Sequence, residues 1–162
     1  MPDSNSSSTA SVLETVANLG VLHEVIVIDP AFADTDAFCE KYGFPLEKSG
    51  NTIVVASKKE PKVYVACVVL AITRLDVNKR VRKLMGVSKA SFASAEEMNA
   101  LTGMEVGGVT PFSLPDGMPL YVDSRLMALE WVILGGGGRE LAGRRAARAA
   151  RGLCTPAAAH RG

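Results

Sequence analysis

Two glycine-rich loops in the second half of the chain constrain its fold more than any other feature. Gly107 and Gly108 are followed by a β-branched pair and then by Pro111, and a second glycine run occupies 135–138. Glycine lets a backbone adopt positive φ and approach a neighbour closely, while Pro111 fixes the next turn and keeps Thr110 extended. N–H groups left free in such a turn can bind an anion or an oxyanion. These loops therefore mark places where the backbone must come close to another group.

Short apolar runs bounded by turn residues predict the strands. The run at 63–73 is almost continuously apolar, which is typical of a largely buried strand. We expect four of these runs to be strands of one sheet. They are 52–57, 63–73, 120–122 and 131–134, and a further strand is expected at 24–28.

Capping signals and helical spacing predict the helices. Asp76 is a good N-cap, and Ser94 with Glu97 forms a capping box. Helices are expected at 10–19, 35–42, 77–84 and 95–101. Because helices and strands do not alternate in regular βαβ units, we expect a single α+β domain with a mostly antiparallel or mixed central sheet and peripheral helices.

The two ends of the chain differ in composition from its body. Residues 1–9 are mostly small and polar, and we expect them to be disordered. Residues 10–140 form the expected domain, in which acidic residues outnumber basic ones. Residues 141–162 are rich in alanine and arginine and have no hydrophobic stripe, so we expect a disordered or loosely helical tail.

Several kinds of enzyme site have no support in the sequence. His23 and His160 lie far apart, and no serine stands in a G-x-S-x-G turn, so a Ser-His-Asp triad is not expected. Three widely spaced cysteines without a C-x-x-C motif argue for a reducing compartment and against a structural metal site. No dinucleotide or phosphate-loop fingerprint is present, so no cofactor is expected. The apolar stretch 63–72 is too short to cross a bilayer, and a cytoplasmic protein is expected.

The motifs between Asp76 and Asp123 carry a family resemblance. Asp76 opens a helix that contains Lys83–Leu84, the segment 89–93 follows, and an acidic helix leads through Thr102–Gly103 into the Gly-Gly-Val-Thr-Pro loop. Asp123 closes the next strand, and a glycine loop follows a further apolar strand. In order and spacing the chain resembles the YbaK/EbsC-like aminoacyl-tRNA editing domains associated with prolyl-tRNA synthetase. The resemblance implies that the sheet is curled.

The resemblance also implies an activity, namely that of a trans-acting deacylase that hydrolyses the ester of a mischarged tRNA. Such domains act by positioning: backbone amides, a lysine, an aspartate and the terminal ribose hydroxyl of the tRNA take the place of a nucleophile. The matching catalytic positions are Asn51, Gly107, Gly108 and Asp123. The matching substrate-binding positions are Lys48, Thr110, Pro111, Gly135, Gly136 and Gly137. The implied partners are the acceptor end of a mischarged tRNA and an aminoacyl-tRNA synthetase, without a metal or a membrane.

Charge gives a weaker indication of tRNA contact. Lys79 and Lys83 share one helix face with Arg80 beside them, so these three residues are weak candidates to bind tRNA phosphates; the alternative is a solvated helix face. The tail at 141–162 lacks the alternating basic and apolar strand that family members carry there. It has either diverged or been encoded by a slipped reading frame.

Position 51 departs from the family pattern. Familiar members carry a lysine at the start of this strand, whereas this chain has Asn51, with Lys48 three residues earlier. Asparagine can hydrogen-bond a carbonyl or a ribose, but it supplies no fixed charge. Either Lys48 reaches the site, or Asn51 supports slower hydrolysis, or the pocket binds without hydrolysing. The alternative to a deacylase is therefore a non-catalytic module that binds tRNA or an amino-acid-like ligand.

The resemblance makes a geometric prediction as well. Asn51, Gly107, Gly108, Asp123 and the loop 135–138 should converge on one concavity although they are far apart in the sequence. Asp123 would then orient the substrate ammonium group or a water. Its other possible role is to cap a turn by binding nearby amides or the following arginine.

Overall fold

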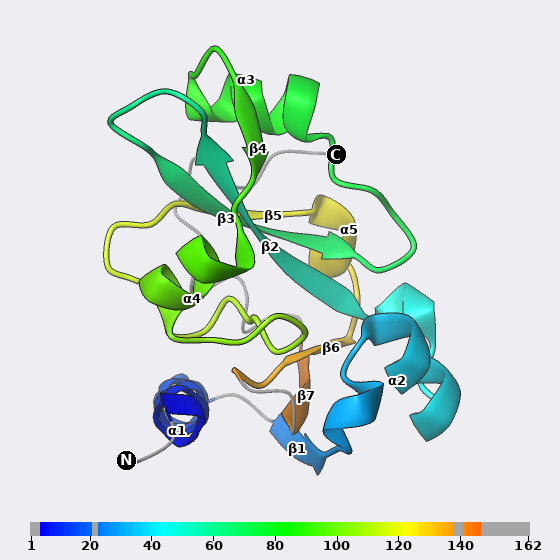
Figure 1. The fold of residues 1–162 in the computed structure, drawn as a ribbon. Coiled ribbons are helices and arrows are strands. Elements are labelled where there is room, and N and C mark those ends of the chain that lie inside the picture. The colour runs from blue at the N-terminus through cyan, green and yellow to red at the C-terminus, as the bar shows by residue number, and fades with distance from the viewer. Residues whose placement is uncertain (1–3, 21–22, 138–140, 147–162) are drawn as a thin grey trace.

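The apolar runs of the sequence form strands, and the capped segments between them form helices (Figure 1). The computed structural model describes residues 4–20, 23–137 and 141–146. The helical elements are α1 (Ser4–Asn18), η1 (Pro30–Phe32), α2 (Thr35–Tyr42), η2 (Leu46–Lys48), η3 (Val77–Val81), α3 (Arg82–Met85), α4 (Ala95–Thr102) and α5 (Ser124–Met127). The strands are β1 (His23–Val27), β2 (Gly50–Ser57), β3 (Tyr64–Leu70), β4 (Ala90–Phe92), β5 (Leu120–Val122), β6 (Trp131–Gly135) and β7 (Leu141–Ala146). The expected α+β class is confirmed.

The larger of the two sheets is four-stranded and mixed. Its strand order is β4-β2-β3-β5, in which β3 and β5 are parallel and the other pairs are antiparallel. Strand β4 pairs with only the last three residues of β2, opposite Val55, Ala56 and Ser57. The first part of β2 therefore has no strand partner on the β4 side of this sheet. This open edge becomes important for the site.

The remaining strands form a second sheet, of order β1-β7-β6 and antiparallel throughout. The prediction that 131–134 lies in one sheet with the other three runs is therefore wrong, because β6 pairs with β7. A bridge between Ser49 and Ile133 joins the two sheets where β2 begins. An apolar run indicates a strand, but its partner is chosen by packing, which a local pattern does not encode.

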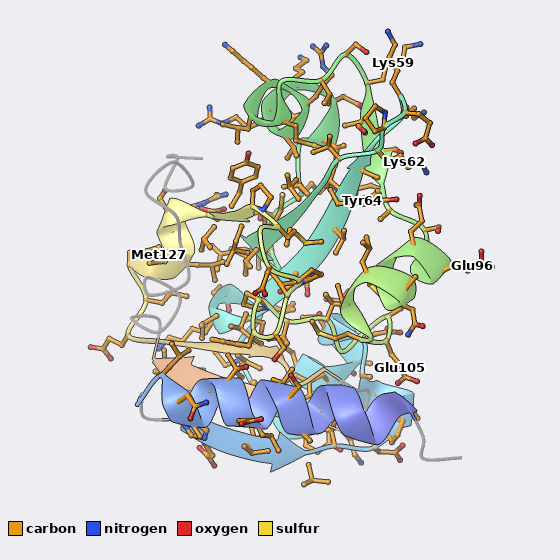
Figure 2. The ribbon with its side chains drawn as sticks, turned by 90° about the vertical axis from the view of Figure 1, so that its left-hand side faces the viewer. Lys59, Lys62, Tyr64, Glu96, Glu105 and Met127 are labelled. Carbon is orange, nitrogen blue, oxygen red and sulfur yellow. The ribbon has the colours of Figure 1, made fainter. Side chains whose placement is uncertain are left out.

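The main core lies between the two sheets. Val54 and Val68 of the larger sheet and Val132 and Leu134 of β6 belong to it, together with Val12 on α1. On the opposite side of β6, Ile133 packs with Phe38 of α2 in a separate cluster. Alternate residues of β6 thus face different cores, as the two-residue period of a strand requires. Helix α1 lies across the smaller sheet (Figures 1 and 2).

The predicted helix signals between 76 and 103 are confirmed. The carboxylate of Asp76 accepts a hydrogen bond from the backbone N–H of Lys79 at 3.0 Å. Ser94 and Glu97 form both bonds of the capping box at the start of α4. The Glu97 carboxylate also pairs with Lys62 and accepts a bond from the Tyr64 hydroxyl. Because of the Lys62 and Ser94 bonds, the pKa of Glu97 falls to about 2.

Parts of both chain ends that we expected to be disordered have regular structure. They are residues 4–9 and 141–146. Helix α1 begins at Ser4, so residues 4–9 are helical; Val12 and Val16 are fully buried, and a helix anchored there extends outward at little cost. Residues 141–146 form the central strand of the smaller sheet, bonded to a strand on each side. Backbone hydrogen bonds to both neighbouring strands hold residues 141–146 in place, so this segment is ordered without a hydrophobic stripe. Residues 1–3 and 147–162 lie outside the described part.

None of the helices described is both long enough and apolar enough to span a bilayer.

Candidate active site

A cavity of about 330 Å³ lies where the open edge of β2 meets the start of α2, the segment from β4 to α4, and the two glycine loops. A volume of this size is at the lower end of the range for small-molecule sites. Its polar lining comprises Asp34, Thr35, Ser49, Asn51 and Thr52, with backbone from Gly50, Gly107 and Gly135. Its apolar lining comprises Ile28, Ala33, Phe38, Ile53, Val54, Phe92, Ala93, Ala95, Met98, Val106, Val109, Ile133 and Leu134.

Thr52 offers polar groups to the cavity from the open edge of β2. The carbonyl oxygen of Val54 accepts a bond from Ala93 N–H at 2.9 Å, so Val54 directs its backbone groups to the β4 side. Alternate residues of an antiparallel strand direct their N–H and C=O groups to the same side. The backbone N–H and C=O of Thr52 therefore point to the β4 side of β2, at a level that β4 does not reach. Its hydroxyl is buried without a hydrogen-bond partner in the described structure.

Asn51 lines the cavity, and its side chain is held by the start of α2. The hydroxyl of Thr35 donates to Asn51 Oδ1 at 2.5 Å. With its oxygen occupied in this way, the amide group directs two N–H donors from Nδ2 elsewhere. Among the described residues, Nδ2 has no acceptor. Asn51 thus supplies a neutral donor where the family pattern has a cation.

The two glycine loops meet beside the cavity. Gly137 N–H donates to the Gly108 carbonyl at 2.7 Å, and Glu105 N–H donates to the Gly137 carbonyl at 3.3 Å. A Cβ placed on Gly135 would lie 2.6 Å from the Gly108 carbonyl oxygen and 2.7 Å from that of Val109. No real side chain tolerates such a distance to backbone atoms, so this approach requires glycine at 135.

The two glycines of the first loop have different roles. Gly108 N–H donates to the Glu105 carbonyl at 2.9 Å, and its own carbonyl is bound to Gly137, so both of its backbone groups are engaged. This corrects the expectation that the amides of Gly107 and Gly108 both face a ligand. Gly107 is exposed, has φ 91°, and its N–H has no acceptor among the described residues. The available donor of this loop is therefore Gly107 N–H.

Asp34 is the one ionisable residue of the described lining, and the sequence interpretation did not select it. It stands at the N-cap position of α2, but its side chain makes no capping hydrogen bond. The described ion pairs, Lys62–Glu97 and Arg125–Asp123, do not include it. Its exposed carboxylate is therefore available to a cation in the cavity.

Asp123 lies elsewhere. It follows β5, and β3 separates β5 from β2 in the sheet. Its carboxylate accepts bonds from Arg125 Nη2 at 2.6 Å and from Arg125 N–H at 2.9 Å. These bonds to Arg125 hold the pKa of the Asp123 carboxyl below its ordinary value, against the opposing effect of burial. Asp123 thus has the turn-capping geometry that the sequence left open, and it is not among the described residues lining the cavity.

The other expected substrate contacts also lie outside the lining. Lys48 Nζ lies 4.5 Å from the centroid of the Trp131 ring, so its charge is directed to the start of β6. Thr110 is fully buried, and its hydroxyl has no partner among the described residues. Pro111 lines a different hollow beside α1, and Gly136 and Gly137 are buried in the loop junction. Of the expected residues, the structure brings together Asn51, Gly107 and Gly135.

Thr35 and Thr52 were missed along with Asp34. Thr52 could have been recognised from the sequence, because it is a polar residue next to Asn51 at the start of the apolar run 53–56. Asp34 and Thr35 read as ordinary helix-start residues, and their place at the cavity depends on how α2 lies against β2. No local pattern carries that information.

The lining favours binding and polarisation of a substrate over attack by a protein nucleophile. No histidine, lysine or cysteine is among the described residues of the lining. Cys67 lies in the sheet core, where burial raises the pKa of its thiol to about 12, so it stays protonated. What remains is one carboxylate, several neutral donors and an apolar wall. This set can hold an amino group and a carbonyl oxygen.

Comparisons with known proteins concern the family and the fold. The sequence matches the model of the aminoacyl-tRNA editing domain family over residues 29–142. Among solved structures, it resembles a hypothetical protein, APE2540, with a TM-score of 0.78 at 24% identity, covering 88% of this chain and 93% of that one. It also resembles a proposed trans-editing enzyme for prolyl-tRNA synthetase, with a TM-score of 0.76 at 21% identity, covering 90% of each chain.

At these identities the two structures establish the fold, whereas the family match, which extends over most of the chain, concerns the sequence itself. It begins at Asp29, just before η1, and ends within β7, so it includes every lining residue of the cavity except Ile28. The chain belongs to the aminoacyl-tRNA editing domain family.

Proposed function

We propose that this protein is a trans-acting aminoacyl-tRNA deacylase, which hydrolyses the ester between a wrong amino acid and the 3′ end of its tRNA. The observation that carries the proposal is the unpaired carboxylate of Asp34 in the same cavity as the donors of Asn51, Thr52 and Gly107. An aminoacyl ester carries an ammonium group one carbon away from its carbonyl. A carboxylate and a set of neutral donors in one small cavity match these two groups.

In this proposal Asp34 binds the substrate ammonium group, and the donors bind the carbonyl oxygen. Water adds to the carbonyl carbon, the resulting oxyanion is held by Asn51 Nδ2 and Gly107 N–H, and the ester bond breaks as the ribose oxygen takes a proton. Oriented neutral donors of this kind typically contribute about 3–4 kcal/mol each to lowering such a barrier. The neighbouring ribose hydroxyl of the tRNA assists in orienting the water, as the family resemblance implies.

The apolar wall of the cavity selects the amino acid. Phe38, Ile53 and Met98 lie in the lining, and a side chain that fits against them is retained. Discrimination between apolar side chains that differ by one methylene is about 10- to 200-fold in such pockets. The partners in this proposal are the acceptor end of the mischarged tRNA and the synthetase that produces it, with prolyl-tRNA synthetase as the first to test because of the structural neighbour.

A second candidate function is a non-catalytic binding module on the same fold. The observation that favours it is Asn51, bound through its oxygen to Thr35, in place of a charged residue. A cavity without a cation binds a carbonyl group less strongly in the transition state, so it can hold an aminoacyl end without cleaving it.

The deciding experiment is a deacylation assay with a panel of mischarged tRNAs. Hydrolysis of at least one of them by the native protein supports the deacylase, whereas binding without turnover on any of them supports the module. Asn51→Lys sharpens the result: increased turnover would show that asparagine weakens a catalytic position. If Asn51→Lys abolishes an existing activity, asparagine is adapted to its substrate and the module interpretation fails.

A further inference from the structure

One end of the four-stranded sheet carries basic side chains from three separate segments of the sequence. We call it the basic end and define it by Lys58 and Lys59 in the β2–β3 turn, Lys79 and Lys83 on η3 and α3, and Lys89 before β4. All five side chains are exposed. The described ion pairs include none of them. The acidic residues nearby, Glu60 and Asp76, accept bonds from the backbone of Lys62 and Lys79.

The fold brings these segments together. Lys58 N–H donates to the Lys89 carbonyl at 3.0 Å, which joins the turn to the start of β4. Val77 and Val81 pack with Val55 and Ala90 in one buried cluster, which holds the η3–α3 segment against the same end of the sheet. Figure 2 shows Lys59 at this end, well away from Glu96 on α4. The basic end is therefore a tertiary feature of three segments.

Strand β4 leads from the basic end to the cavity. Lys89 immediately precedes β4, whereas Phe92 ends it and lies in the cavity lining. Three residues of strand span about 10 Å. Strand β4 is also an edge strand, so no other strand covers this path in the described sheet.

Phe92 is unusual for a large apolar residue at such a place. Its side chain is 60% exposed, and Val106, also in the lining, is 53% exposed. An exposed aromatic ring beside a line of cations is the arrangement by which proteins hold single-stranded nucleic acid, because bases stack on the ring while cations bind the backbone.

We propose that β4 is the path of the tRNA acceptor arm: Phe92 stacks a base of the single-stranded 3′ end, while Lys58, Lys59 and Lys89 contact the phosphates that precede it. The direction of the path rests on the proposed function, because that function places the 3′ ester in the cavity. The phosphate contacts make affinity fall with salt, since each contact releases counterions.

The first test measures the affinity for uncharged tRNA against salt concentration. The double variant Lys59→Gln/Lys89→Gln should lower the slope of log affinity against log salt by about 1.5, the value for two lost phosphate contacts. The matched control is Lys41→Gln/Arg74→Gln, which removes the same charge from exposed residues outside the basic end and should leave the slope nearly unchanged. Equal slopes for the two double variants would overturn the proposal.

The second test separates stacking from charge. Phe92→Ala should weaken the binding of intact tRNA by about 5- to 150-fold, the range for one lost base stack, and Phe92→Tyr should preserve it. Neither change should affect the binding of tRNA trimmed of its single-stranded 3′ end. Ile72→Ala, at a side chain of similar exposure outside the cavity, is the control. An equal loss with intact and trimmed tRNA would contradict the role of Phe92.

Failure of this inference can be told apart from failure of the proposed function. If the variants show these binding differences but the protein hydrolyses no aminoacyl ester, the acceptor path along β4 is supported and the deacylase proposal is refuted. If the protein deacylates tRNA but the two double variants show the same salt dependence of tRNA affinity, the deacylase proposal is supported and the acceptor path is refuted.

Discussion

Asp34 precedes α2 and Asp123 precedes α5, yet their carboxylates meet different surroundings. Asp123 binds the backbone and guanidinium of Arg125, two residues later, and its side chain is only 6% exposed. Asp34 makes no capping bond and faces the cavity with Asn51 and Gly107. Both residues occupy the N-cap position of the helix that follows. An aspartate at a helix start is thus available to bind a ligand only when its neighbours leave it unpaired in a cavity.

The largest expected effect tests the cavity side of this comparison. Gly135→Ala places a Cβ against two backbone carbonyl oxygens, so the loops must separate or strain. We expect a loss of about 3 kcal/mol in unfolding free energy, as for an overpacked site, together with the loss of ligand binding. Denaturant unfolding and binding of aminoacyl-tRNA measure the two effects.

Gly50→Ala is the matched control for this substitution. Its added Cβ meets the end of the Leu134 side chain at 2.8 Å, and a side chain yields more easily than backbone. If Gly50→Ala destabilises the protein more than Gly135→Ala, the close approach of Gly135 to the backbone of the first loop does not require glycine at 135.

The next effect concerns the free carboxylate. Asp34→Asn should reduce kcat/KM for a mischarged tRNA by about tenfold, because a charge-assisted contact with the ammonium group is lost. Stability should hardly change, since Asp34 makes no capping bond. Asp36→Asn removes the same charge from an exposed position in the first turn of α2 and should leave kcat/KM as it is. Equal activity losses in the two variants would point to a general charge effect.

The smallest effect is expected at the paired carboxylate. Asp123→Asn should leave kcat/KM unchanged and lower the unfolding free energy at neutral pH by about 1 kcal/mol, the usual value of a hydrogen bond in this setting. Because the folded pKa of Asp123 lies below its ordinary value near 3.8, its stabilisation is complete above that value and is lost as the pH falls through the lower folded value. The difference between wild type and variant should therefore shrink in acid, which denaturation at pH 7 and pH 3 can show. A lower kcat/KM for Asp123→Asn would show that Asp123 contributes to the active site after all.

Much of the fold could be predicted because its signals are local. Ser94 and Glu97 lie within one turn and form their capping box without help from the rest of the chain. Asp76 and Gly86 bound the segment between them in the same way. The pairing of β6 with β7 could not be predicted, because residues 141–146 are recruited by neighbours on both sides through backbone bonds.

The part of the site formed by the glycine loops could be predicted, because glycine runs mark unusual backbone conformations or close approaches. Gly107 and Gly135 stand out because each belongs to a run of adjacent glycines, and Asn51 stands out by its departure from the family pattern. Asp34 and Thr35 could not be distinguished from ordinary helix-start residues. Their role depends on contacts with β2, which lies more than ten residues away in the sequence.

The apolar runs, the helix caps, the glycine loops and the family resemblance could all be identified before folding, since each depends on residues close together or on a matching order of motifs. The packing of the folded chain was needed to show that β4 stops short and leaves Thr52 at an open edge, and that the backbone groups of Gly108 are bonded while the Gly107 N–H is available. It also decided that the carboxylate facing the cavity belongs to Asp34 and not to Asp123. A polar group's partners are set by distance in space, and those distances exist only when all elements of the chain have packed.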